Sequence, residues 1–396
     1  IPKASYMEKD RIVIIGTGLA GYTFAREFRK LNSTIGLHVI TADDGSYYSK
    51  PMLSNGFSSG KSAADLVIQS AQAMSVQLSA RIDTHAVVGS LDLAARCVEV
   101  DGRHHAYSRL VLALGAQPIR LPLEGNATQA ILPVNNLADY DLLRQRLAGK
   151  RRVVVLGAGL IGCEFANDLC LADFEVHLVD TGNMPLTGLL PAEVARVLRA
   201  RLEAEGVFFH TGISCVSVDH HDGAYRLRFS DGTLLDADVV LSAVGLRPDT
   251  ALAHAAGLKV MRGIVVDQWL QTSDLHAYAL GDCAEVCGLV LPYVMPIMHA
   301  AKALASTLAG KRTPVHYPAM PIVLKTPSFP LVVTPPRTED GEWSFEANEA
   351  GIKGLYQDSS NLLRGFALAG DAVSARRALA QNLPAWLPAN EVSHAA

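Results

Sequence analysis

The sequence predicts an α/β fold: two strand–turn–helix units of one design, followed by a small C-terminal α+β domain. The main observation is a glycine-rich turn that occurs twice. Residues 16–21 follow the apolar run 11–15, and residues 157–162 follow the apolar run 152–156. In each case a buried strand, a tight turn and the start of a helix are expected. Because the turn repeats in the same local context, we do not interpret it as a merely structural glycine turn.

The glycine spacing within each turn is that of a dinucleotide fingerprint. The first glycine permits the tight turn, the second lets the backbone approach a pyrophosphate, and the third allows close helix–strand packing. The helix N-terminus adds free N–H groups and partial positive charge. We therefore expect two dinucleotides in two Rossmann-like domains. The expected contact residues are Gly16, Thr17, Gly18, Leu19, Ala20 and Gly21 in the first unit, and Gly157, Gly159, Leu160, Ile161 and Gly162 in the second.

The order of elements predicts that the second unit is inserted in the first domain. Residues 1–117 and 245–319 are assigned to a discontinuous first domain, and residues 118–244 to a second domain. A segment rich in Pro, Asn and Gly opens the second domain, and the pattern changes again after Gly245. Residues 320–396 form the C-terminal domain.

Composition narrows the classes of partner. With 396 residues, a net charge of −4 and no apolar run of about 18 residues, the chain is expected to bind no nucleic acid and to have no membrane span. Six scattered cysteines suggest a cytoplasmic location rather than a disulfide framework. The thirteen histidines show no metal-ligand spacing, so no metal site is predicted.

Five motifs in a fixed order resemble the flavoprotein reductases of the glutathione-reductase fold, over about residues 11–335. The loop 48–54 and the segment 320–327 are similar to those of the rubredoxin reductases within that group. The resemblance implies that the first unit binds FAD, that the second binds NAD(P)H, and that the electrons pass to rubredoxin, with alkane oxidation as the setting. The motifs are residues 16–21, 112–118, 157–164, 242–248 and 272–282.

Further FAD contacts are implied by the resemblance. Asp282 is expected to bind the ribityl hydroxyls; the alternative is a helix N-cap, because a helix is expected over 283–286. The usual acidic residue at the end of the second strand is not clear, since Thr41 occupies that position and Asp43 lies just beyond. The partner of the adenosine ribose is therefore left open. Other expected cofactor contacts are Val87, Gly245, Gly281, Val294 and Lys325.

Asp180 indicates which nicotinamide dinucleotide is used. It ends a predicted strand 21 residues beyond Gly159, the spacing of a ribose-binding carboxylate. A carboxylate accepts bonds from a 2′-hydroxyl and repels a 2′-phosphate, and no Arg occurs in residues 181–184. NADH is therefore favoured, with a simple strand-end turn residue as the alternative role of Asp180.

Lys50 and Glu164 are the expected catalytic residues. The resemblance implies that they form a pair beside the flavin ring, where a fixed cation favours the anionic reduced flavin. Without the resemblance, Lys50 would be interpreted as a solvated loop charge, and Glu164 as an acidic residue stabilised by the helix dipole. Lys325 is expected to be a second cation near the flavin.

The first domain has no cysteine before Cys97. Disulfide reductases and thiol peroxidases of this fold need a thiol beside the flavin, so the electrons are expected to leave directly for an external acceptor. Cys283 and Cys287 are interpreted as buried small residues. The alternatives to rubredoxin reduction are reduction of a [2Fe–2S] ferredoxin, reduction of flavorubredoxin, and a non-enzymatic FAD/NADH-binding sensor.

Overall fold

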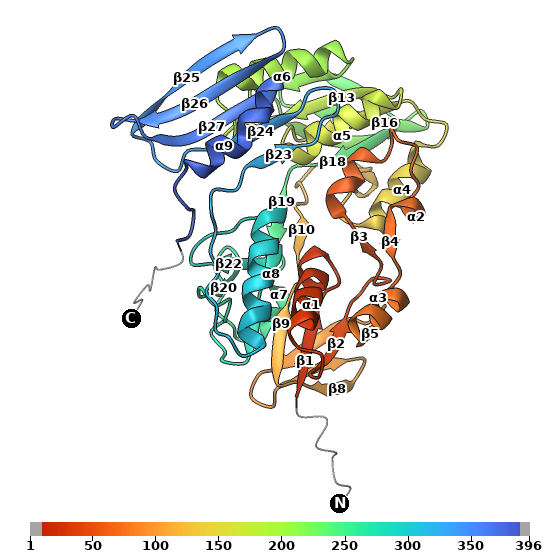
Figure 1. Cartoon of the computed structure of the whole chain (residues 1–396). Helices are drawn as coiled ribbons and strands as arrows, with labels where there is room; N and C mark the ends of the chain where they lie inside the picture. The colour runs from red at the N-terminus through yellow and green to blue at the C-terminus, as the bar shows by residue number, and fades with distance from the viewer. Residues whose placement is uncertain (1–9, 389–396) are drawn as a thin grey trace, which may run out of the picture.

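A computed structural model describes residues 10–388, and the predicted domain ends at 1–9 and 389–396 lie outside the described residues (Figure 1). The first sheet has five parallel strands in the order β21-β9-β1-β2-β5. The strand β21 follows the whole second unit in sequence, so the chain returns to complete this sheet. Its strands are β1 (Arg11–Ile15), β2 (Gly36–Ile40), β5 (Ala80–Asp83), β9 (Arg109–Leu112) and β21 (Ala277–Ala279).

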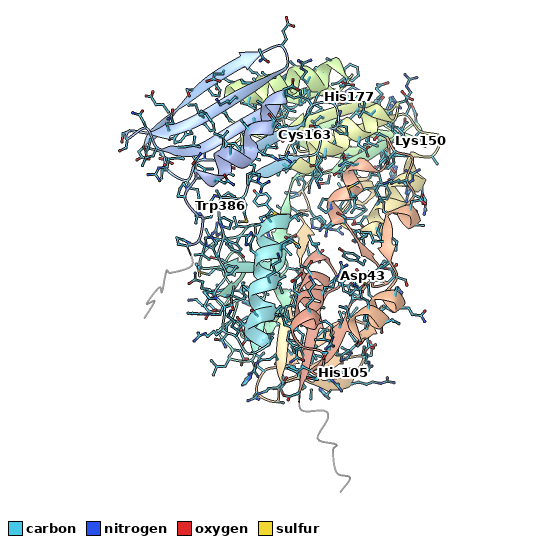
Figure 2. The ribbon with its side chains drawn as sticks, viewed as in Figure 1. Asp43, His105, Lys150, Cys163, His177 and Trp386 are labelled. Atoms are coloured by element: carbon cyan, nitrogen blue, oxygen red, sulfur yellow. The ribbon has the colours of Figure 1, made fainter. Side chains whose placement is uncertain are left out.

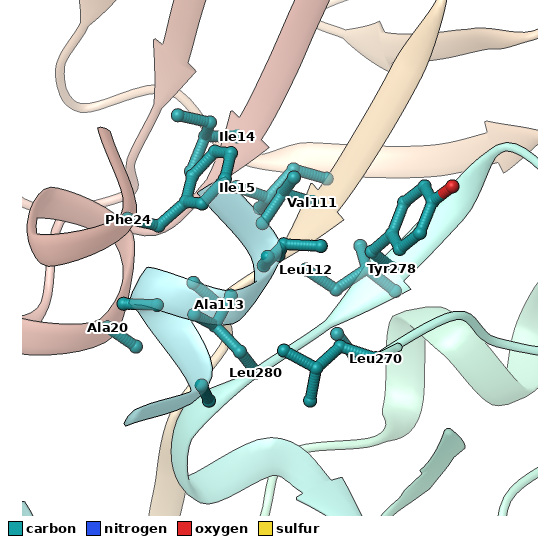
Figure 3. Packing of buried hydrophobic residues seen from close by; sticks show 14 of the residues in the cluster. Ile14, Ile15, Ala20, Phe24, Val111, Leu112, Ala113, Leu270, Tyr278 and Leu280 are labelled. Atoms are coloured by element: carbon teal, nitrogen blue, oxygen red, sulfur yellow. The ribbon is translucent and has the colours of Figure 1, made fainter. Parts of the chain in front are cut away.

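Helices α1 (Leu19–Leu31) and α8 (Val294–Leu308) lie side by side against the first sheet. Apolar side chains of α1, β1, β9 and β21 fill one buried core, which Figure 3 shows around Phe24 and Val111. This core fixes the first glycine turn, because the turn joins β1 to α1. The smaller elements near it are α3 (Ala71–Leu78), α7 (Ala251–Ala255), and the antiparallel strands β6 (Val88–Asp92), β7 (Cys97–Val100) and β8 (Arg103–Ala106).

The second sheet repeats this design in the order β11-β18-β12-β13-β14, again with all strands parallel. Helix α5 (Leu160–Leu171) follows the second glycine turn, and α4 (Leu137–Leu147) and α6 (Ala192–Ala204) belong to the same unit. The fold class predicted from the two glycine turns is confirmed. The strands are β11 (Leu132–Pro133), β12 (Arg152–Leu156), β13 (Glu175–Asp180), β14 (Phe208–Thr211) and β18 (Val239–Ser242).

Short antiparallel strands complete both units. The strands β16 and β17 pair with each other as an antiparallel hairpin with its turn near residue 231. The strands β10 and β19 pair where the chain leaves the first unit and re-enters it. The bounds are β10 (Ala116–Pro118), β15 (Cys215–His221), β16 (Ala224–Phe229), β17 (Leu234–Ala237) and β19 (Leu246–Pro248), with the 3-10 turn η3 (Thr128–Ala130) before β11.

The segment after β21 differs from the expectation. Instead of a helix over 283–286, a 3-10 turn η4 (Gly281–Cys283) leads into β22 (Ala284–Val286), which pairs in parallel with β20 (Ile264–Val266). Ladder bonds to β20 and burial of all three residues favour the strand over the helix. Cys283 is buried as expected, whereas Cys287 is exposed, which corrects the prediction.

The C-terminal domain is an antiparallel sheet in the order β23-β24-β27-β26-β25, with helix α9 (Arg376–Gln381) after it. Its apolar face and the second unit share one buried cluster, which includes Leu324, Phe329 and Leu198. Leu53 and Phe57, from the first part of the chain, belong to the same cluster. The strands are β23 (Ile322–Leu324), β24 (Leu331–Thr334), β25 (Gly341–Asn348), β26 (Gly351–Asp358) and β27 (Leu363–Gly370), and the turn η5 (Asp371–Ala375) follows.

The residues between β2 and β5 cross from the first sheet to this shared cluster. They contain β3 (Tyr47–Tyr48), the 3-10 turn η2 (Lys50–Asn55), α2 (Ala63–Leu66) and β4 (Val67–Gln69). The η2 turn contacts α5 and α4 of the second unit. Among residues 10–388, no helix has the length and apolar character needed to cross a bilayer.

Candidate functional site

The two glycine turns have the same backbone geometry. Gly16 and Gly157 have positive φ angles of 110° and 104°, which favour glycine. A Cβ on the third glycine, Gly21 or Gly162, would collide with the carbonyl oxygen of the first glycine in the same turn. A Cβ on Gly18, by contrast, would meet no atom within 4 Å, and the same holds for Gly159. The open side of the second glycine fits the close approach of a phosphate group.

A small polar network lies beside the first turn. Asp43 Oδ1 accepts hydrogen bonds from Thr17 Oγ1 at 3.0 Å and Thr41 Oγ1 at 2.6 Å. The backbone amide of Gly45 also donates to this oxygen, at 2.9 Å. All three bonds use Oδ1, and Asp43 is exposed (labelled in Figure 2), so Oδ2 can accept a ligand hydroxyl. Val87 is 64% exposed just before β6, so the chain leaves its apolar surface uncovered.

The corresponding carboxylate of the second unit is Asp180, at the end of β13. Asp180 Oδ2 accepts from the backbone amide of Ala158 at 2.6 Å, inside the glycine turn. Asp180 Oδ1 accepts from the amide of Gly182, also at 2.6 Å. The Asp180 carboxylate is thus hydrogen-bonded to the second glycine turn, and its contact with a ribose stays a prediction.

Lys50 and Asp282 approach each other from distant parts of the chain. Burial lowers the pKa of the Lys50 ammonium, while the negative charges of Asp282 and Asp139 oppose the shift. Burial raises the pKa of Asp282, and Lys50 opposes that shift. Among residues 10–388, no donor is hydrogen-bonded to the Asp282 carboxylate, which fits a hydroxyl-bearing ligand. Gly281, at φ 80°, lies with its Cα next to Ala20 of the first turn.

Glu164 has partners other than the expected one. None of the ion pairs among the described residues joins it to Lys50, whose Nζ instead donates to Asn135 Oδ1 at 2.5 Å. Glu164 is 7% exposed and accepts from Ser54 Oγ at 2.5 Å and from the backbone amide of Lys325 at 2.8 Å. Lys50 lies at the start of η2, whereas Ser54, near its end, faces α5. Burial raises the pKa of Glu164, and its hydrogen bonds oppose the shift.

Comparison with known proteins identifies the family. Residues 10–306 match the pyridine nucleotide-disulphide oxidoreductase family, and residues 314–383 match the rubredoxin binding C-terminal domain. The chain belongs to the pyridine nucleotide-disulphide oxidoreductase family. Membership confirms the predicted oxidoreductase class, with FAD and a nicotinamide dinucleotide as cofactors.

Curated relatives cover almost all of this oxidoreductase. It is 46% identical to a rubredoxin-NAD(+) reductase of Alcanivorax borkumensis, over 95% of this chain and 99% of the relative. Identity is 44% to a rubredoxin-NAD(+) reductase of Acinetobacter baylyi, over 96% and 99%. Sequence identity is 39% to a nitric oxide reductase FlRd-NAD(+) reductase of Aeromonas hydrophila, over 94% of this chain and 96% of the relative. The resemblance to rubredoxin reductases drawn from the sequence is confirmed.

Solved structures agree on the fold. A ferredoxin reductase for the CYP199A2 system from Rhodopseudomonas palustris superposes with a TM-score of 0.86 at 25% identity, covering 95% of this chain and 96% of that one. The covalent putidaredoxin reductase-putidaredoxin complex gives a TM-score of 0.85 at 26% identity, covering 95% and 94%.

Three other residues predicted to contact the cofactors lie where the two glycine-turn units and the C-terminal domain meet. Gly245, at φ 116°, begins the return to the first unit. Val294 opens α8 and is 40% exposed. Lys325 Nζ donates to the Pro51 carbonyl at 3.3 Å, so this second cation lies beside the Lys50 loop. No disulfide joins any of the six cysteines, and no group of three His, Cys, Asp or Glu among residues 10–388 could hold a metal ion.

Sequence reasoning missed four polar residues of this oxidoreductase. Asn135 holds the Lys50 ammonium and Ser54 holds Glu164. Asn167 and Asp168 are fully buried on α5, three and four residues after Glu164. For the two residues on α5, the available signal was the helical spacing of Glu164, Asn167 and Asp168 in an otherwise apolar helix.

Proposed function

We propose that the protein is an NADH-dependent reductase that passes electrons one at a time to rubredoxin. FAD, held by the first unit, supplies hydride acceptance and one-electron release when bound. The match of residues 314–383 to the rubredoxin binding C-terminal domain supports this carrier more than any other observation. Alkane oxidation, the predicted setting, is consistent with the relative from Alcanivorax borkumensis. We also propose a cytoplasmic location, where thiols stay reduced.

Each set of residues has a proposed task. The backbone amides at Gly16–Gly21 and Gly157–Gly162 bind the two pyrophosphates, with Gly18 and Gly159 leaving room for them. The Asp43 carboxylate binds the adenosine ribose of FAD, which fills the position left open by the sequence, and Asp180 binds that of NADH. The Asp282 carboxylate accepts hydrogen bonds from the ribityl hydroxyls. Val87 covers the adenine, and Val294 packs beside the flavin ring.

The charged side chains near the flavin set its electrostatic environment. Lys50 and Lys325 place two half-buried ammonium groups at this junction, and both act there as fixed cations. Glu164 orders the Lys325 segment through its hydrogen bond to the backbone amide.

The FlRd-NAD(+) reductase relatives make flavorubredoxin the second candidate acceptor. The test is steady-state reduction of rubredoxin, flavorubredoxin and a [2Fe–2S] ferredoxin by NADH and the purified protein. We expect the highest kcat/KM with rubredoxin. A higher value with either other carrier would overturn the assignment, and slow turnover with all three and with a dye would indicate a sensor.

A further inference from the structure

One face of α5 buries three polar side chains. Glu164, Asn167 and Asp168 are 7%, 0% and 0% exposed, and they lie at positions i, i+3 and i+4 of the helix. Burial of a polar group costs free energy unless it is hydrogen-bonded, and burial of a carboxylate costs more. Three such groups on one helix face therefore need a set of specific donors.

The hydrogen-bond donors to the Asp168 carboxylate all come from residues 57–58, in the segment between β2 and β5. Asp168 Oδ2 accepts from the backbone amide of Phe57 at 2.8 Å. Asp168 Oδ1 accepts from the amide of Ser58 at 3.0 Å and from its hydroxyl at 2.5 Å. Hydrogen bonds to a carboxylate are about twice as strong as neutral ones. Burial raises the pKa of Asp168, and these hydrogen bonds oppose the shift.

The anchored stretch is continuous with the Lys50 loop. Residues 50–58, here called the anchored segment, begin with Lys50 at the proposed flavin site and end with Ser58 on Asp168. Between these points Ser54 is bound to Glu164. The ring of Phe57 packs edge-on against Tyr140, with centroids 5.2 Å apart, and belongs to the core of the second unit. The segment is therefore fixed to α5 at two polar points and to α4 at one apolar point.

The same helix face also holds the C-terminal domain. Asn167 Nδ2 donates to Ser328 Oγ at 2.9 Å, and the Lys325 amide donates to Glu164. At its N-terminus α5 begins at the second glycine turn. One rigid helix thus has a dinucleotide-binding turn at its start and, along one face, the segment that contains Lys50.

We infer that Asp168 is a positioning residue for hydride transfer: it fixes the anchored segment on α5 and so sets the placement of Lys50 and the flavin relative to the bound nicotinamide. The inference rests on the proposed function. Hydride transfer is sensitive to such placement, because a misplacement of about 1 Å can cost about 100-fold in rate. Binding of NADH itself uses the glycine turn and Asp180, which Asp168 does not touch.

The test is stopped-flow reduction of the FAD-loaded protein by increasing NADH concentrations. In Asp168→Asn the side chain keeps its volume but loses its charge and one acceptor atom. We expect the limiting rate of flavin reduction to fall about 10- to 100-fold. The NADH concentration for half-saturation and the FAD content should stay within about twofold. Asp65→Asn, at an exposed carboxylate of α2, is the matched control and should leave the rate unchanged.

Ser58→Ala is the second variant, because it removes only one of the three donors. It should lower the limiting rate by a smaller factor and decides the question if Asp168→Asn does not fold. A second readout is the flavin midpoint potential: Asp168→Asn should shift it in the wild-type background and not in Lys50→Met. An unchanged rate per bound flavin, or a loss confined to FAD content or thermal stability, would overturn the inference. No flavin reduction by NADH in the wild type would instead refute the proposed function.

Discussion

The backbone amide of Lys325 donates a hydrogen bond to the Glu164 carboxylate at 2.8 Å. This bond joins the C-terminal domain to a helix that begins at the second glycine turn. Burial lowers the pKa of the Lys325 ammonium while the charge of Glu164 opposes the shift, so their charges also interact. The proposed carrier-binding domain is thereby attached directly to the proposed NADH-binding unit.

Nicotinamide specificity should depend on Asp180. We expect wild-type kcat/KM to be about 10- to 100-fold higher for NADH than for NADPH, since a charged hydrogen bond contributes about 1.5–3 kcal/mol. Asp180→Ala combined with Asn183→Arg should reduce this preference, because the 2′-phosphate loses a repulsive neighbour and gains a cation. Steady-state kinetics with both cofactors measures it. Equal kcat/KM values in the wild type would refute the role of Asp180.

Lys50→Met should lower the flavin midpoint potential. Loss of a cation near the reduced flavin, at about 1–2 kcal/mol, corresponds to about 20–45 mV for a two-electron couple. FAD should stay bound, because its phosphates and ribityl chain are held elsewhere. Potentiometric titration measures the shift, and Lys61→Met, at an exposed position beyond the anchored segment, is the matched control. An unchanged potential and reduction rate would make Lys50 a loop charge.

Electron transfer should not need a thiol. The anchored segment, residues 50–58, has no cysteine. Burial raises the pKa of Cys283 to about 12, which disfavours its thiolate. Cys283→Ser and Cys287→Ser should each retain carrier reduction within about twofold. The measurement is NADH-dependent carrier turnover per bound FAD. Abolished transfer in a variant that still binds FAD would reveal a redox thiol.

Stability should fall with acidification through His38. This side chain on β2 is 1% exposed, faces Asp83, Arg81 and His105, and has no partner for Nδ1 among the described residues. Burial lowers its pKa below 6.5 while Asp83 opposes the shift, so the unfolded chain binds this proton first. As the pH falls from 6.5 to the lower pKa that His38 has in the folded state, this group lowers the free energy of unfolding by at most about 1.4 kcal/mol per pH unit.

The matching measurement compares the wild type with His38→Gln in denaturant titrations at pH 7.5 and pH 5. The variant should be less stable overall and lose less stability on acidification. Equal losses in both proteins would mean that other groups cause the pH dependence.

Local sequence was sufficient for features formed by neighbouring residues. The glycine turns, the helix starting at Leu160 and Asp180 all follow from contacts within one strand–turn–helix unit. The Glu164 partner did not, because Ser54 and Lys325 reach it from 110 and 161 residues away. The strand over 284–286 was mistaken for a helix because its partner β20 lies about twenty residues earlier. The domain boundaries and the roles of the individual site residues stay predictions.

The cluster that Leu324 and Phe329 share with Leu198 affects how carrier preference can be engineered. A chimera that exchanged only the last 77 residues between two such reductases would place a foreign apolar face on α6 and the anchored segment. Mismatched volumes there cost about 1–3 kcal/mol per overpacked site. Carrier preference and the packing of the NADH-binding unit are therefore expected to evolve together, and a successful exchange would have to include residues 53–57 and the facing side of α6.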